Sequence, residues 1–86
     1  MIVEWTGRFR RAYQRLQESE QDRLDKALRL LVPNAKRPWL HAKRVQGTEA
    51  IWEARSSLKI RFTFERIPDG IRLRNIDDHD ACLKNP

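Results

Sequence analysis

The chain has 86 residues, of which 18 are lysine or arginine and 12 are aspartate or glutamate, so its formal net charge is +6. This length suits a single domain over residues 1–86 with one modest core, and it excludes two independently stable domains. We expect no membrane span, because no apolar run approaches the roughly 18 residues that one needs. We also expect no secretory signal, because Glu4 and Arg8 come before any apolar stretch. The single cysteine, Cys82, excludes an intrachain disulfide framework and suits a reducing cytoplasm.

The basic excess lies in the middle of the chain. Residues 32–66 hold eight basic and three acidic residues, whereas residues 67–86 hold three basic and four acidic ones. A small basic domain favours a polyanionic partner, most often nucleic acid. Solubility alone would explain the same charge, so the net charge does not identify the partner.

Two helices are predicted after a short strand over residues 1–5. Thr6 offers a hydroxyl that can cap a helix, and one helical stripe follows it, made of Phe9, Ala12, Tyr13 and Leu16. Ser19 opens a second helix that ends at Pro33 and Asn34 and whose apolar stripe is Leu24, Ala27, Leu28 and Leu31. Because few residues separate the two helices, we expect an antiparallel helix hairpin.

The pattern changes to strands after Pro38. The expected strands cover residues 40–45, 51–55, 59–66 and 70–76, and Asp69-Gly70 is a strong hairpin-turn signal. Helices first and strands afterwards indicate an α+β fold. It has an N-terminal strand, the helix hairpin and then a mostly antiparallel four-strand segment, with both helices on one face.

Alternation along these strands divides their side chains between two faces. The apolar face, which must pack against the helices, carries Trp52, Ala54, Ile60, Phe62, Phe64, Ile71 and Leu73. The other face, here called the arginine face, carries Glu53, Arg55, Arg61, Thr63, Glu65, Arg72 and Arg74. We expect the arginine face to be open to water, as one face of an antiparallel sheet can be. Its four guanidinium groups would suit phosphate, which they bind in a bidentate fork.

Four segments in this order resemble the RelE/ParE superfamily of type II toxin–antitoxin toxins: Lys43-Arg44-Val45-Gln46-Gly47, Ile51-Trp52-Glu53-Ala54-Arg55, Ile60-Arg61-Phe62-Thr63-Phe64 and Ile76-Asp77-Asp78-His79-Asp80. The spacing from Trp52 to Arg61 and on to His79 is similar to that of the RelE/YoeB-like branch, which cleaves RNA. The resemblance covers nearly the whole chain.

This resemblance implies a ribosome-dependent mRNA endoribonuclease of the prokaryotic cytoplasm, which a cognate antitoxin neutralises. Its RNA partners would be mRNA in the ribosomal A site and ribosomal RNA, and operator DNA would be bound only through the antitoxin complex. In the implied reaction a ribose 2′-hydroxyl attacks the neighbouring phosphate and the 5′-oxygen leaves, without a metal or other cofactor. Such a reaction needs a base, cationic donors and an acid.

The resemblance implies catalytic roles for two residues, one that binds the scissile phosphate and one that protonates the leaving oxygen. Arg61 matches the family's strand arginine and would hold the scissile phosphate; its alternative is a surface pair with Glu53 or Glu65. His79 matches the C-terminal histidine and would protonate the leaving oxygen, because flanking aspartates favour its imidazolium form. Its alternative is an ordinary tail histidine bonded to those aspartates. Further RNA ligands would be Arg55, Arg72, Arg74, Lys43 and Arg44.

The general base departs from the family's pattern. Its position falls near Trp39, which has no proton acceptor, so Glu53 and His41 are the substitutes that the sequence offers. Trp39 could also supply the base stacking that a terminal aromatic residue gives to many relatives. A ParE-like gyrase inhibitor and a non-catalytic toxin-fold binding protein or co-repressor are the alternative functions, and Arg61 together with His79 favours the RNase.

Two other groups of charged residues could form sites. Asp77, Asp78, Asp80 and Cys82 surround His79 without a recognised metal-ligand spacing, so a solvated acidic tail is predicted there and no metal. In the first helix, Arg8, Arg11 and Arg15 could grip ribosomal RNA phosphates or form an ordinary solvated helix face.

Overall fold

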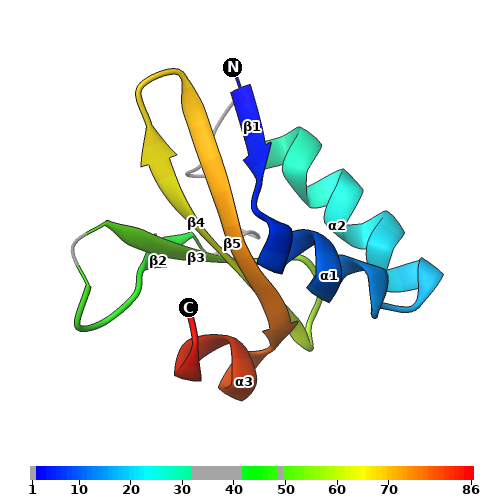
Figure 1. The fold of residues 1–86 in the computed structure, drawn as a ribbon. Coiled ribbons are helices and arrows are strands. Elements are labelled where there is room, and N and C mark those ends of the chain that lie inside the picture. Colours follow the sequence, from blue (N-terminus) through cyan, green and yellow to red (C-terminus); the bar gives the residue numbers. More distant parts are fainter. Residues whose placement is uncertain (1, 32–41, 49) are drawn as a thin grey trace.

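The computed structural model describes residues 2–31, 42–48 and 50–86 (Figure 1). The elements are β1 (Ile2–Trp5), α1 (Gly7–Gln14), α2 (Glu18–Leu31), β2 (Lys43–Arg44), β3 (Ile51–Arg55), β4 (Ile60–Ile67), β5 (Gly70–Asp78) and α3 (His79–Lys84). The strands form one sheet in the order β1-β5-β4-β3-β2. The β1–β5 pair is parallel, and the other neighbouring strands are antiparallel. The predicted α+β architecture is confirmed.

The two N-terminal helices form the predicted hairpin. Thr6 caps α1, since its hydroxyl accepts a hydrogen bond of 3.1 Å from the Phe9 backbone N–H. The helix α2 begins at Glu18, one residue before the predicted Ser19. Gln21 joins the two helices by donating from its side chain to the Tyr13 carbonyl at 2.9 Å. None of the helices in the described ranges is long and apolar enough to cross a membrane.

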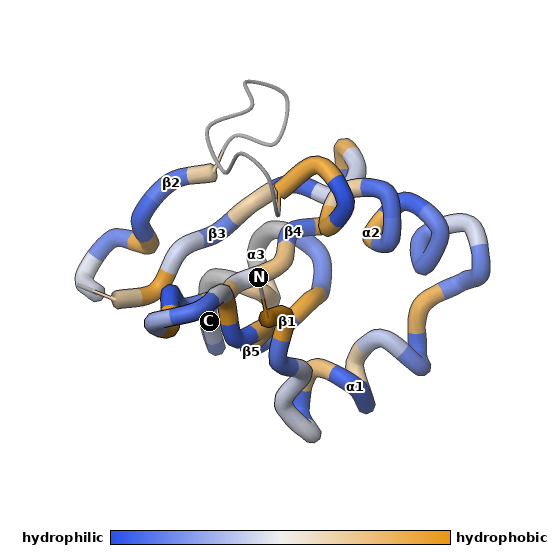
Figure 2. The backbone as a smooth tube through the Cα atoms, turned by 90° about the horizontal axis from the view of Figure 1, so that it is seen from above, coloured by the Kyte–Doolittle hydropathy of each residue, from blue (hydrophilic) through white to orange (hydrophobic). Residues whose placement is uncertain are grey.

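One hydrophobic core lies between α1, α2 and the apolar face of the sheet (Figure 1). Its buried members are Phe9, Ala12, Leu24, Ala27, Leu28, Leu31, Ala54, Phe62, Phe64, Ile71, Leu73 and Ile76. Trp5 extends the core with edge-to-face contacts to Phe9 and Tyr13, each at a centroid distance of 5.0 Å. Figure 2 shows how hydrophilic and hydrophobic residues alternate along the chain around this core. The predicted apolar parity of β4 and β5 is therefore confirmed at Phe62, Phe64 and Leu73.

Trp52 lies on the predicted face but at the edge of the core. Its side chain is half-buried and packs against the core without being enclosed by it. The guanidinium carbons of Arg44 and Arg66 lie 5.4 and 5.0 Å from its ring centroid. Trp52 thus packs against the core on one side and offers its ring to two cations on the other.

A β-bulge in β5 alters the alternation that the sequence predicts. Phe64 pairs with Leu73 but Thr63 pairs with Asn75, so Arg74 is the extra residue. Beyond the bulge, Asn75 joins the arginine face beside Thr63, and Ile76 enters the core with 2% of its surface exposed. The bulge therefore allows both Arg74 and Asn75 to reach the same side of the sheet.

The β4–β5 hairpin turns one residue earlier than predicted. Ile67 pairs with Gly70, so the loop residues are Pro68 and Asp69 rather than Asp69 and Gly70. Gly70 instead meets a close backbone approach: a Cβ at this position would lie 1.7 Å from the Ile2 carbonyl oxygen. The strand β1 therefore requires glycine at the start of β5.

The arginine face is not open as predicted, because α3 and the last residues cover part of it. The Asp78 carboxylate caps α3 by accepting from Ala81 N–H at 2.9 Å. Asp77 and Asp78 are exposed, as expected of a solvated acidic tail, whereas Cys82 is buried. Asn75 donates to the Asn85 carbonyl at 2.9 Å, and Arg74 donates to the Pro86 carbonyl at 3.1 Å. Under this cover, Thr63 and Cys82 are 0% exposed.

Candidate RNA-binding face

Two cross-strand rows organise the arginine face. One row runs Lys43, Glu53, Thr63 and Asn75 across four strands, and the next runs Arg55, Arg61 and Asp77 across three. Directly opposite side chains on antiparallel strands lie about 4.5–5.5 Å apart at Cβ. The register therefore places the predicted base Glu53 beside the predicted phosphate ligands Arg55 and Arg61.

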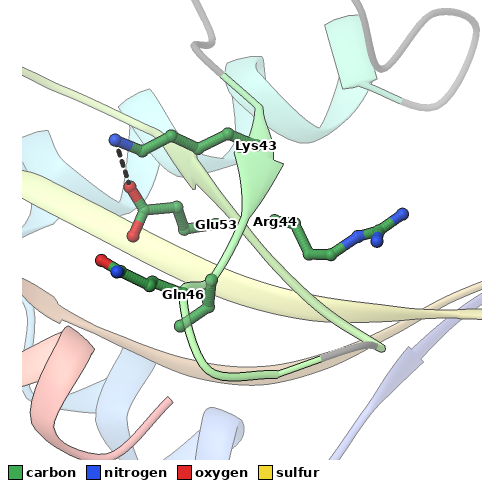
Figure 3. Close-up of a pocket in the computed structure, with 5 residues that line it drawn as sticks. Lys43, Arg44, Gln46 and Glu53 are labelled. Carbon is green, nitrogen blue, oxygen red and sulfur yellow. Dashed lines mark ion pairs between the residues drawn. The ribbon is translucent and has the colours of Figure 1, made fainter.

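Glu53 lines a hollow at the β2 edge of the sheet (Figure 3). This hollow of about 400 Å³ is bounded by Lys43, Arg44, Val45, Gln46 and Glu53. Glu53 is only 3% exposed, and its Oε1 lies 3.5 Å from Nζ of the exposed Lys43. A nearly buried carboxylate needs such a partner, because an unpaired buried charge is costly. Glu53 therefore faces the hollow as an acceptor held by one lysine.

Lys43 and Arg44 diverge, although they are neighbours in β2. Figure 3 shows Lys43 and Gln46 on the side of the Glu53 carboxylate and Arg44 extending away from it. Arg44 lies over Trp52 on the other face of the sheet. The structure therefore brings Lys43, but not Arg44, to the carboxylate of Glu53.

Arg55 and Arg61 are cross-strand partners, and both are half-buried. Like charges directly opposite each other destabilise a strand pair, so this position concentrates positive potential. Arg61 Nη1 donates to the Ser57 carbonyl at 3.1 Å, in the segment that joins β3 to β4. This contact holds the guanidinium at the end of the two strands, and it replaces the carboxylate pairing considered as the alternative for Arg61.

Arg72 and Arg74 are engaged by carboxylates. Arg72 contacts Glu4 Oε1 at 2.8 Å and Glu65 Oε1 at 3.0 Å, and Arg74 contacts the same Glu65 oxygen at 3.4 Å. Hydrogen bonds to Glu4 and Glu65 raise the pKa of Arg72. The two predicted RNA ligands thus form a surface ion-pair network, and phosphate binding would have to compete with Glu65.

The backbone of His79 lies next to the Arg61 row. His79 is the first residue of α3, and it follows Asp78, the cross-strand partner of Ile60. Its side chain lies outside the described part of the structure, as do Trp39 and His41 entirely. The predicted acid is therefore placed by its backbone alone, and the roles proposed for Trp39 and His41 stay predictions.

Cys82 and Thr63 form a buried layer that the sequence did not reveal. The pKa of the Cys82 thiol rises to about 12, first because of burial and then because of the charges of Glu53 and Asp77. A protonated, enclosed thiol is a poor nucleophile or metal ligand. Among the described residues, no group of three or more histidine, cysteine or acidic side chains is arranged to hold a metal ion.

No family model and no curated protein sequence matches this chain. Solved structures do. The YafQ toxin complex with DinJ from E. coli has a TM-score of 0.77 and 15% identity, covering 93% of each chain. The YoeB dimer from Staphylococcus aureus has a TM-score of 0.78 and 11% identity, covering 92% of this chain and 97% of that one.

A third similar structure is the RelB–RelE antitoxin–toxin complex from Methanococcus jannaschii. It has a TM-score of 0.71 and 14% identity, and the match covers 95% of this chain and 96% of that one. Matches this extensive include the helix hairpin and the sheet that bears the arginine face. The chain therefore has the RelE/YoeB-like toxin fold.

Proposed function

We propose that this protein is the toxin of a type II toxin–antitoxin system and acts as a ribosome-dependent mRNA endoribonuclease. The observation that supports this most directly is the juxtaposition of Glu53, Arg55 and Arg61 on adjacent strands of a toxin fold. A carboxylate acceptor beside two permanent cations supplies the base and the cationic donors that metal-independent cleavage of a phosphodiester requires, in addition to an acid.

The reaction would use these groups in one displacement. Arg61, with Arg55, holds the non-bridging oxygens of the scissile phosphate and stabilises the charge of the pentacovalent transition state. Glu53 takes the proton of the attacking 2′-hydroxyl, and Lys43 is then free to contact the phosphate. His79 gives a proton to the leaving 5′-oxygen. The products are a 2′,3′-cyclic phosphate and a 5′-hydroxyl end.

The natural partners follow from the same proposal. A cognate antitoxin would neutralise the protein, as antitoxins accompany the YafQ and RelE toxins in the solved complexes. We expect its inhibitory segment to be acidic where it meets Arg55 and Arg61, because complementary charge sets orientation and association rate. The protein would act in the prokaryotic cytoplasm, on mRNA in the ribosomal A site, and reach operator DNA only with its antitoxin.

The test is inducible expression followed by mapping of mRNA 5′ ends on translating ribosomes. Wild type should create new 5′ ends within codons and stop growth. Arg61→Ala should reduce cleavage about 10²–10³-fold, the usual effect of removing one donor to a transition-state oxyanion. Arg10→Ala, an exposed arginine of α1 away from the face, is the matched control and should cleave normally. Equal cleavage by Arg61→Ala and wild type would remove Arg61 from the mechanism.

A non-catalytic or gyrase-directed protein of the same fold is the second candidate. It is favoured by the engagement of Glu53 with Lys43 and of Arg72 and Arg74 with Glu65, because these contacts reduce the groups available to RNA. Growth arrest with no new mRNA ends, together with inhibited DNA supercoiling by gyrase, would establish the gyrase-directed function instead. If neither mRNA cleavage nor gyrase inhibition were observed, the non-catalytic binding function would be supported.

A further inference from the structure

A second hollow lies between α1 and α3, and its position and charge are distinct from those of the Glu53 hollow. It has a volume of about 410 Å³, and its polar lining includes Arg8, Arg15, Asn75, Asp77 and Lys84. Three cations against one carboxylate give the described part of this lining a charge of +2. We refer to it as the α1–α3 hollow.

The cations of the α1–α3 hollow come from two elements. Arg8 and Arg15 are seven residues apart in and just after α1, which places them on one side of the helix two turns apart. Lys84 ends α3 and approaches from the other side. Arg8 and Asn75 both donate to the Asn85 carbonyl, which ties the end of the chain to this edge. The hollow is thus built by the docking of α3 on the sheet.

These cations differ from those of the arginine face in their partners. Among the side chains that the structure describes, a set that does not include His79, Asp80 and Leu83, Arg8, Arg15 and Lys84 form no ion pair with a carboxylate, whereas Arg72, Arg74 and Lys43 each do. All three are exposed. They therefore retain their capacity to bind an anion at little cost in lost pairing.

The α1–α3 hollow adjoins the candidate site at Asp77. Asp77, which lines the hollow, is the cross-strand partner of Arg61. A strand of RNA whose scissile phosphate lay on Arg55 and Arg61 would therefore reach the hollow with a flanking nucleotide. The carboxylate of Asp77 would repel an acidic peptide. A ribose 2′-hydroxyl, in contrast, can donate a hydrogen bond to it.

We propose that the α1–α3 hollow binds a phosphodiester of the RNA strand flanking the scissile phosphate. In this arrangement Arg8, Arg15 and Lys84 hold the phosphate, and Asp77 accepts from a neighbouring 2′-hydroxyl. This inference rests on the proposed function. It adds that the hollow selects RNA over DNA, because only a ribose supplies the hydroxyl that Asp77 accepts from.

The test measures binding off the ribosome, in the purified Arg61→Ala protein so that expression is tolerated. Fluorescence anisotropy with a short labelled RNA is recorded at several salt concentrations. Adding Arg15→Ala should weaken binding about tenfold and reduce the magnitude of the salt slope by about 0.7, the value for one phosphate contact on a single strand. Adding Arg10→Ala instead should change both the RNA affinity and the salt slope by less than Arg15→Ala does. Equal effects of the two variants would show diffuse charge attraction and overturn the proposal.

A second variant tests the role of Asp77. Asp77→Asn keeps the shape and can still accept the 2.8 Å hydrogen bond from Asp78 N–H. We expect the ratio of RNA to DNA affinity to fall several-fold, measured with strands of matched sequence. An unchanged ratio would contradict the assignment of the 2′-hydroxyl. Loss of antitoxin binding by Arg15→Ala with normal RNA binding would assign the hollow to the antitoxin instead.

The two proposals can fail separately. Wild-type cleavage of mRNA on ribosomes, with no special effect of Arg15→Ala on RNA binding, would leave the endoribonuclease intact and remove the α1–α3 hollow from the RNA path. Absence of cleavage would overturn the endoribonuclease, while the anisotropy measurements would still report on the hollow.

Discussion

Replacing each of the three glycines by alanine should change the stability of the protein by a different amount, and Gly70→Ala should be the most destabilising. The added Cβ would lie 1.7 Å from the Ile2 carbonyl oxygen, whereas real contacts stay above 3.0 Å. The strand β1 must therefore retreat by more than about 1 Å, which stretches the 2.7 Å hydrogen bond from Ile2 N–H to the Asp69 carbonyl beyond its useful range. Losing about two such bonds at about 1 kcal/mol each, with added strain, predicts a destabilisation of about 2–4 kcal/mol.

The other two glycines supply the controls. At Gly7 the new methyl would meet only the flexible end of Arg11 at 3.2 Å, so Gly7→Ala should leave stability unchanged or raise it by up to about 1 kcal/mol. Gly47 has φ of 84° with nothing within 4 Å, so Gly47→Ala should cost about 1–2 kcal/mol through its backbone alone. Urea denaturation of all three variants measures the series. A Gly70→Ala protein as stable as wild type would refute the close approach of β1.

Three further outcomes are expected. Phe62→Ala should lower the free energy of unfolding by about 3–5 kcal/mol in urea titrations, and Trp52→Ala by clearly less, because Phe62 is 0% exposed and Trp52 is only half-buried. Glu65→Ala should cost under about 1 kcal/mol by thermal melting despite its two arginine contacts, since the network is on the surface. Stability should fall above about pH 8.5, where the unfolded thiol ionises but the folded Cys82, with its pKa raised to about 12, does not; Cys82→Ala should remove part of that fall.

The apolar half of the fold could be predicted because its signal is periodic. Phe62, Phe64 and Leu73 alternate with polar residues, and a strand with one buried face has no other register that keeps them inside. The helix hairpin followed similarly from apolar spacing and from Thr6. The half-burial of Trp52 could not be predicted in this way. Alternation along a strand gives the face of the sheet on which a side chain lies, but not how much of that side chain is buried.

The polar half could not be predicted in the same way. Nothing in the alternation marks Arg74 as the extra residue of a bulge, yet the bulge decides that Asn75 lies with Thr63. Burial of Thr63 depends on α3 and the residues after it, whose docking is a tertiary contact that local pattern does not encode. In the candidate site, the neighbourhood of Arg55 and Arg61 followed from strand pairing, but the capture of Arg72 by Glu65 depends on side-chain geometry at that register.

The pairing of β1 with β5 also has a consequence for the order of events during synthesis. The contact of Arg72 with Glu4 joins residues separated by 68 positions, and the register of β1 follows that of β5. A nascent chain therefore holds β1 without its partner until residues 70–73 have left the ribosome, and such non-local closure is intrinsically slow. The helix hairpin can form early, but the sheet that presents Arg55 and Arg61 closes last. A protein proposed to attack ribosome-bound mRNA would thus present Arg55 and Arg61 in a complete sheet only after residues 70–73 have been made and have reached β1.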